Sequence, residues 1–145
     1  MIFFDNRTDF EIDGNILALL ESITHSVTNR DIELLLVSND EICALNAEFL
    51  GKDCATDVLS FPLDLSKADS THLPLGSIVI SLEMAQSVAD SQNHSLQSEL
   101  AILFTHGLLH LLGYDHECDS GEHRIKEREI LARFGIETTL ISRNS

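Results

Sequence analysis

Leu100 to Leu112 reads LAILFTHGLLHLL, and this stretch decides which fold the rest of the chain can build. Nine of its 13 residues are alanine, isoleucine, leucine or phenylalanine. A helix that is apolar nearly all round is a buried helix, so the stretch predicts a central helix enclosed by other elements. Ser95 is a suitable N-cap for a helix over 96–112, and Gly113 is a suitable residue to end it.

The segments on either side supply elements that can enclose this helix. Short runs rich in branched apolar residues predict strands, and longer stretches with apolar residues at helical spacing predict helices. Strands and helices alternate along the chain, which favours an α+β fold with a mixed sheet in one domain over 1–145. The expected strands are 2–4, 32–37, 58–61 and 78–81. Four further helices are expected: 15–25, one that is capped within 38–41 and ends at 50, 82–92, and a last one that Ser120 caps and Gly135 ends. Residues 66–74 are expected to form an exposed loop.

Composition limits the kind of partner that the protein can have. The formal net charge is −15, which argues against a protein that coats nucleic acid, DNA included, through a basic surface, and against adhesion to an anionic membrane. No run of 18 apolar residues is present, and no signal peptide is expected. Cys43, Cys54 and Cys118 form neither a disulfide framework nor a CxxC pair, which favours a reducing compartment and a cytoplasmic protein.

Three histidines in and after the buried helix form a candidate metal site. His106 and His110 are four residues apart, so one helical turn of about 3.6 residues places both imidazoles on one face. Gly113 permits a chain reversal, after which His116 can reach the same point. The pattern HxxxHxxGxxH thus predicts three nitrogen ligands for one ion. Three neutral imidazoles suit zinc, with nickel or another divalent ion as an alternative, and leave a fourth position open for water or substrate.

The other histidines fit this geometry less well. His25 ends an amphipathic helix and is expected to be a cap or surface group, and His72 lies in the expected loop. His94 lacks the spacing of a ligand. His123 begins the last helix, seven residues after His116, and is at most a supporting group behind the ligands.

The ligand spacing overlaps that of the metzincin proteases, HExxHxxGxxH, but the catalytic part differs. That protease chemistry needs a glutamate after the first histidine as general base, and this chain has Gly107 there. Metzincins also place a methionine turn after the third histidine, whereas Met1 and Met84 both precede it. A zincin-like peptidase or other hydrolase is therefore the weaker hypothesis.

The segment from His106 to His116 resembles the signature H-G-x-L-H-L-x-G-Y-D-H of the YbeY family at every fixed position. Gly51 to Pro62, GKDCATDVLSFP, is similar to the family segment GKDxPTDVLSFP, and Gly76 to Ser81, GSIVIS, is similar to its GDIVIS strand. The closing helix, with Glu129-Ile130-Leu131 and Phe134-Gly135, also resembles the family. These matches span most of the chain, in the family's order.

The resemblance implies a zincin-like α+β fold with one zinc ion on His106, His110 and His116. It also implies a metal-dependent endoribonuclease that acts on single strands. The implied role is maturation of the 3′ end of 16S ribosomal RNA and ribosome quality control, with ribosomal RNA and ribosome-associated proteins as partners.

One departure from the family affects the expected RNA contacts. The family has an arginine before its GKD segment, and here that position is Leu50, which cannot pair with a phosphate. Either Lys52 or another cation takes the place of that arginine, or RNA binding differs; Lys52 is otherwise a solvated loop lysine. Asp115, beside His116, is either a catalytic base or ligand-orienting group, or simply a turn residue. A second class of function stays open: a non-catalytic ribosome-biogenesis factor with a structural zinc.

Overall fold

A four-stranded mixed sheet forms the centre of the computed structural model, which describes residues 1–63, 74–115, 117–137 and 140. The strand order is β1-β2-β4-β3, with β1 parallel to β2, β2 parallel to β4, and β3 antiparallel to β4 at one edge. The prediction of an α+β fold with a mixed sheet is thus confirmed. The strands are β1 Ile2–Asn6, β2 Ile32–Val37, β3 Val58–Pro62 and β4 Gly76–Ser81.

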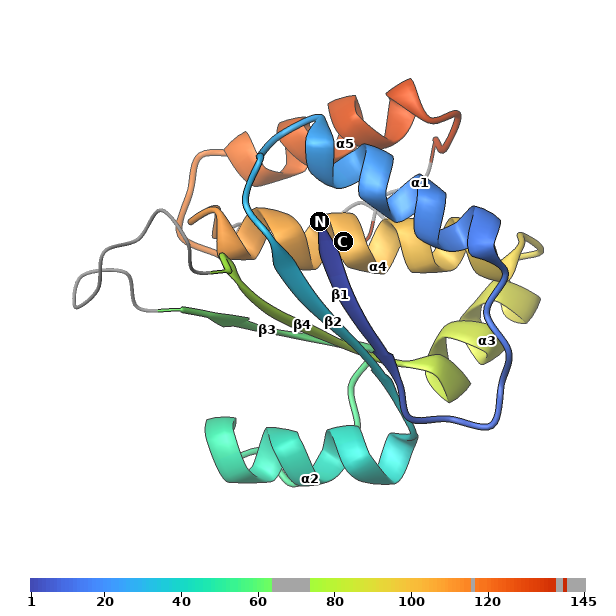
Figure 1. The fold of residues 1–145 in the computed structure, drawn as a ribbon. Coiled ribbons are helices and arrows are strands. Elements are labelled where there is room, and N and C mark those ends of the chain that lie inside the picture. Colours follow the sequence, from blue (N-terminus) through green and yellow to red (C-terminus); the bar gives the residue numbers. More distant parts are fainter. Residues whose placement is uncertain (64–73, 116, 138–139, 141–145) are drawn as a thin grey trace.

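Helices cover both faces of the sheet, unequally. Figure 1 shows α1, α4 and α5 on one side and α2 alone on the other, with α3 beside the start of α4. The helix α4 contacts β3, β4, α1, α3 and α5, so it is the central helix of the fold. The helices are α1 Gly14–His25, α2 Asn39–Leu50, α3 Leu82–Ser91, α4 Leu96–Leu111 and α5 Glu122–Arg133.

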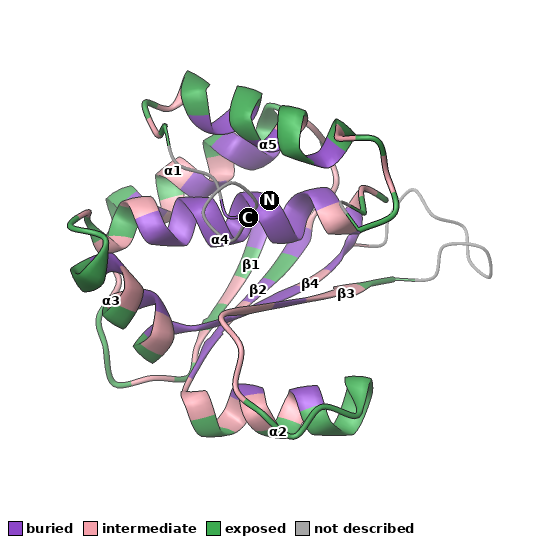
Figure 2. Cartoon of the chain, turned by 180° about the vertical axis from the view of Figure 1, so that it is seen from behind, coloured by how far each residue is buried: buried purple, intermediate pink, exposed green. Residues whose placement is uncertain are grey.

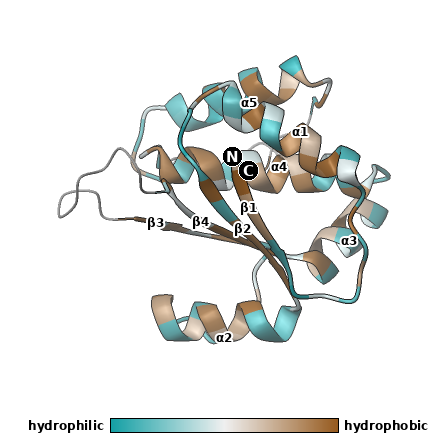
Figure 3. Ribbon diagram, in the orientation of Figure 1, coloured by the Kyte–Doolittle hydropathy of each residue, from teal (hydrophilic) through white to brown (hydrophobic). Residues whose placement is uncertain are grey.

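The interior consists of two apolar clusters, one on each face of the sheet. The larger cluster surrounds α4, in which every residue from Glu99 to Leu109 is buried. The smaller cluster joins Val37, Leu59 and Val79 of the sheet to Ile42 of α2. Figure 2 shows the burial of α4, and Figure 3 shows the apolar strands between the helices. Burial of α4 on all sides follows from its apolar sequence.

Most helix boundaries agree with the sequence, with one exception. The hydroxyl of Ser95 accepts a hydrogen bond from the Ser98 amide and caps α4 as predicted. The predicted cap of α5 by Ser120 is wrong, because the N-cap is Gly121, at φ 107°. The side chain of Asp119 takes over the capping, since its Oδ1 accepts from the Gly121 amide at 2.8 Å and its Oδ2 from the His123 amide at 2.9 Å. Of the predicted 66–74 loop, residues 66–73, with His72, lie outside the described residues.

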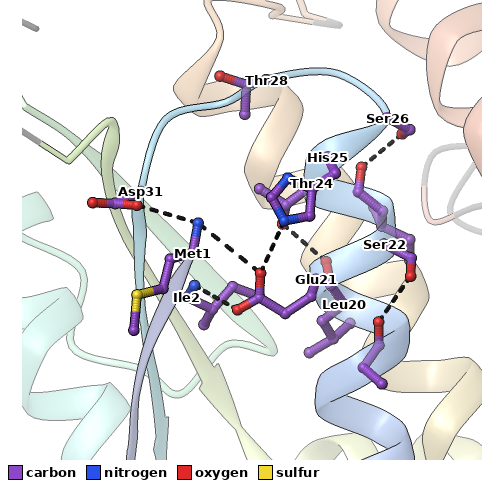
Figure 4. A network of polar contacts seen from close by, with 12 residues as sticks. Met1, Ile2, Leu20, Glu21, Ser22, Thr24, His25, Ser26, Thr28 and Asp31 are labelled. Carbon is purple, nitrogen blue, oxygen red and sulfur yellow. Dashed lines mark hydrogen bonds and ion pairs between the residues drawn. The ribbon is translucent and has the colours of Figure 1, made fainter.

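The N-terminus is tied to α1 by a set of polar contacts (Figure 4). The Ile2 amide donates to Glu21 Oε1 at 2.7 Å, and the Met1 ammonium lies 3.2 Å from Asp31 Oδ1. His25 Nε2 lies 3.5 Å from Glu21 Oε2, and its side chain is 59% exposed, as expected of a surface group. The contact of Ile2 with Glu21 holds the first strand against α1, and that of Met1 with Asp31 holds it against the residue before β2.

In the described parts of the chain, no helix combines the length and apolar character needed to cross a bilayer.

Candidate metal centre and cleft

The two histidines of α4 project from one face of the helix, as their spacing predicts. His106 is buried and His110 is half-buried, and their Nε2 atoms lie 3.1 Å apart. Tetrahedral ligands at about 2.0–2.1 Å from zinc are separated by about 3.3 Å. The spacing of these two nitrogens therefore suits a shared ion.

A third described histidine joins this pair from another helix. His123, in the first turn of α5, is fully buried, and its ring stacks on His106 with centroids 4.6 Å apart. The centroid of the His110 ring is 4.8 Å away. One ligand atom from each of the three histidines can be chosen so that all lie within 4.8 Å of one another, a cluster consistent with a metal site. His116, the predicted third ligand, lies outside the described residues.

The sequence predicts His123 to be at most a supporting group, and the structure places its ring in the histidine cluster. The buried residues of α5 are His123, Glu127, Ile130 and Leu131, which follow the spacing of a core-facing stripe. Two polar residues on the apolar stripe of a helix must meet polar groups inside the protein. That pattern could have directed attention to both His123 and Glu127.

Glu127 is a buried carboxylate at the cluster that sequence reasoning missed altogether. Its side chain is completely buried, and its Oε2 lies 3.5 Å from His106 Nδ1. Its other oxygen, Oε1, accepts a hydrogen bond from the Leu140 amide at 3.1 Å. The carboxylate thus contacts the ring of His106 on the side opposite the Nε2 atom that faces His110.

A cleft of about 650 Å³ opens beside the histidines, between α4, β3 and the segment after α2. His106, His110, Asp115 and Lys52 all line it, so the structure brings these sequence-predicted residues together. Leu50 also lines it and is 52% exposed. Among the described lining residues, Lys52 is the only lysine or arginine; the acidic ones are Asp57, Asp115 and Glu117.

Asp115 has a turn role as well as a place in the cleft. Its Oδ1 accepts a hydrogen bond from the Glu117 amide at 3.1 Å, the contact of an aspartate that shapes a turn. A hydrogen bond to Asp115, reinforced by the carboxylate charge, raises the pKa of the Cys118 thiol. Asp115 therefore acts electrostatically on its neighbours and stabilises the turn at the end of α4.

Gly107 is required by close packing between α4 and the edge of the sheet. A Cβ atom at this position would lie 2.9 Å from Ser60 Oγ and 3.2 Å from Ile78 Cγ2. The Ser60 hydroxyl donates to the Gly107 carbonyl at 3.2 Å. Metzincins have their general base at this position, whereas this chain has a glycine that packs closely against β3.

Comparisons with known proteins find similar sequences over nearly the whole chain. Residues 4–135 match the sequence profile of the family described as "Endoribonuclease YbeY". Relatives with that name include proteins of Nautilia profundicola, 51% identical over 144 residues with 99% of each chain covered, and Aliarcobacter butzleri, 50% identical over 145 residues with 100% of each covered. A Helicobacter pylori relative is 47% identical over 99% of this chain and 98% of its own.

A solved structure also resembles this fold. The solution structure of TM1509 from Thermotoga maritima aligns with a TM-score of 0.58 and 26% identity. The alignment covers 93% of this chain and 92% of that one.

Proposed function

The chain belongs to the endoribonuclease YbeY family, and on that premise we propose that it is a metal-dependent endoribonuclease acting on single-stranded RNA. The observation that carries the proposal is the pair of Nε2 atoms of His106 and His110, 3.1 Å apart and lining an open cleft. Two neutral imidazoles at this spacing suit a divalent ion, and the cleft lets an RNA strand approach it.

The ligands in this proposal are His106, His110 and His116, and the ion is zinc, with nickel as an alternative. When bound, the ion would polarise a phosphoryl oxygen and lower the pKa of a water molecule. His106 and His110 project from one face of the buried helix α4, which holds their Nε2 atoms 3.1 Å apart. His123 packs against His106 and supports its ring.

Lys52 and Asp115 are the two further cleft residues in the proposal. Lys52, two residues after Leu50, supplies a positive charge to the cleft. Leu50 itself has no charge with which to bind a phosphate. Asp115 serves as a base or orients a ligand from the turn that follows α4. In a protein of net charge −15, these local contacts would give weak, salt-sensitive binding to free RNA.

The biological role that we propose is maturation of the 3′ end of 16S ribosomal RNA, together with ribosome quality control. Residues 1–145 would act as one metallohydrolase domain in the cytoplasm. Ribosome-associated proteins would supply much of the targeting that the acidic surface cannot provide.

Replacing His110 by alanine tests the catalytic proposal. We expect the His110→Ala protein to lose zinc, measured by elemental analysis, and to lose cleavage of a defined single-stranded RNA even when zinc is added back. His25→Ala is the matched control, because His25 is an exposed histidine of α1. Unchanged RNA cleavage by His110→Ala would exclude a metal-centred mechanism at this site.

Two alternatives give different results in the same preparation. A non-catalytic biogenesis factor would bind zinc through these histidines but leave precursor ribosomal RNA intact when purified free of other nucleases. A peptidase would cleave casein, which we do not expect because Gly107 and Ser60 fill the place of the protease base.

A further inference from the structure

Glu127 is the buried carboxylate behind the candidate metal centre, and its two oxygens have different partners. Oε2 lies 3.5 Å from His106 Nδ1, and Oε1 accepts from the Leu140 amide at 3.1 Å. The exposed fraction of the Glu127 side chain is 0%, and that of His106 is 9%. A carboxylate in this setting can only accept hydrogen bonds while it is ionised, so Nδ1 of His106 has to be the donor.

The proton on Nδ1 decides what the other nitrogen of His106 can do. A neutral imidazole carries one proton, so Nδ1–H leaves a lone pair on Nε2. That Nε2 atom is the one that faces His110 Nε2 at 3.1 Å. With the proton of His106 on Nδ1, the hydrogen bond between the two Nε2 atoms would be donated by His110 and accepted by the lone pair of His106.

We propose that Glu127 is a positioning residue that holds His106 as the Nδ1–H tautomer and thereby keeps Nε2 ready to bind metal. The role of Nε2 in metal binding rests on the function proposed above, whereas the tautomer of His106 does not depend on it. Carboxylates behind metal-binding histidines fix ring orientation and increase the basicity of the ligand. Here the carboxylate comes from α5, a different helix from the one that carries the ligand.

The same carboxylate ties the C-terminal part of the chain to the site. Leu140 is buried against the main apolar cluster and lines the same cleft as His106 and His110. Its amide bonds to the oxygen of Glu127 that does not face His106. One side chain thus fixes both a ring at the centre and a wall of the cleft.

Glutamine at position 127 separates these two tasks with almost no change in shape. Its carbonyl oxygen can still accept from the Leu140 amide, and its NH₂ group then faces His106 Nδ1. Because an NH₂ group donates, Nδ1 becomes the acceptor and the proton of His106 moves to Nε2. Nitrogen-15 NMR of the metal-free protein near pH 8, where free imidazoles are neutral, reads the tautomer directly.

We expect Nδ1–H on His106 in the unmodified chain and Nε2–H in Glu127→Gln, with zinc affinity about 10–100-fold lower in the variant by competition with a chelator. Glu129→Gln is the control, because Glu129 is exposed on the same helix and the charge change is identical. It should leave both readouts unchanged.

Nε2–H on His106 in the unmodified chain would overturn the proposal, and this measurement needs no variant. An unchanged tautomer in folded Glu127→Gln, or an unchanged zinc affinity, would overturn it as well. If the unmodified chain binds no metal but shows Nδ1–H that depends on Glu127, the proposed function fails while the positioning of His106 stands.

Discussion

Both ends of α4 pair a histidine with a buried glutamate, but the two pairs differ in which nitrogen the glutamate contacts. At the N-terminal end, His94 Nε2 lies 2.8 Å from Glu99 Oε1. Toward the C-terminal end, Glu127 contacts Nδ1 of His106 at 3.5 Å, and Nε2 of His106 faces His110. The first pair engages Nε2 and joins residues close in the sequence, whereas the second engages Nδ1 and leaves Nε2 of His106 facing His110.

The difference shows how the same two residue types can stabilise a fold or prepare a site. His94 and Glu99 are five residues apart, so their contact joins the residue before the N-cap of α4 to the first turn of that helix. His106 and Glu127 are 21 residues apart and join α4 to α5.

The largest expected effect is on stability, at the N-terminal pair. Glu99→Ala empties the space of a fully buried side chain and removes the partner of the part-buried His94, which together cost about 3 kcal/mol. We expect the free energy of unfolding in urea to fall by that amount, while the zinc affinity of the folded protein stays the same. A loss of zinc affinity comparable to that of a ligand variant would mean that the two ends of α4 are not independent.

At the other end, His106→Ala should act mainly on metal binding. Groups that only support a ligand are worth about 10–100-fold in affinity, so loss of a ligand should cost about 100-fold or more. Isothermal titration with zinc measures this, and His94→Ala is the matched control on the same segment. Equal zinc affinity in His106→Ala and His94→Ala would mean that the histidine near the C-terminal end of α4 is no more important for metal binding than the one before its N-terminal end.

Gly107, next to His106 in α4, should show a packing effect. The Gly107→Ala methyl group would lie 2.9 Å from Ser60 Oγ, and overpacking of this kind costs about 1–3 kcal/mol. Adding Ser60→Ala should recover part of the loss, because it removes the nearest atom. Gly14→Ala is the control, since a Cβ there meets nothing within 4 Å. Thermal unfolding of the four proteins measures the effect.

The smallest effect concerns the charge of Asp115 after α4. Asp115 raises the pKa of the Cys118 thiol, which disfavours the thiolate, and the thiolate is the form that reacts with iodoacetamide. Asp115→Asn should therefore lower this pKa and speed alkylation of Cys118 near pH 8, with the rate profile shifted to lower pH. Cys43 is an internal control, because the pKa of its thiol is raised by burial and by Asp53, which the Asp115 variant leaves unchanged. If the pH dependence of Cys118 alkylation is unchanged in Asp115→Asn, the carboxylate of Asp115 does not raise the pKa of this thiol.

The sequence alone determined α4 and the pair of histidines on it. The helix was expected over 96–112 and spans Leu96–Leu111, and its apolar composition predicted its burial. His106 and His110 share a face because helical geometry fixes the direction of residues four apart, whatever surrounds them. Gly113 has φ 99°, a conformation that its lack of a Cβ permits and that its place after the helix predicted.

Only the tertiary structure decided the strand order, the place of His123 and the partner of His106. The order β1-β2-β4-β3 depends on which strands pair, and alternation along the chain does not specify it. Glu127 reaches His106 because α5 packs on α4, which follows from the burial of many side chains together and not from any local spacing. Short-range geometry thus placed the two imidazoles on one face of α4, and long-range packing placed Glu127 beside Nδ1 of His106.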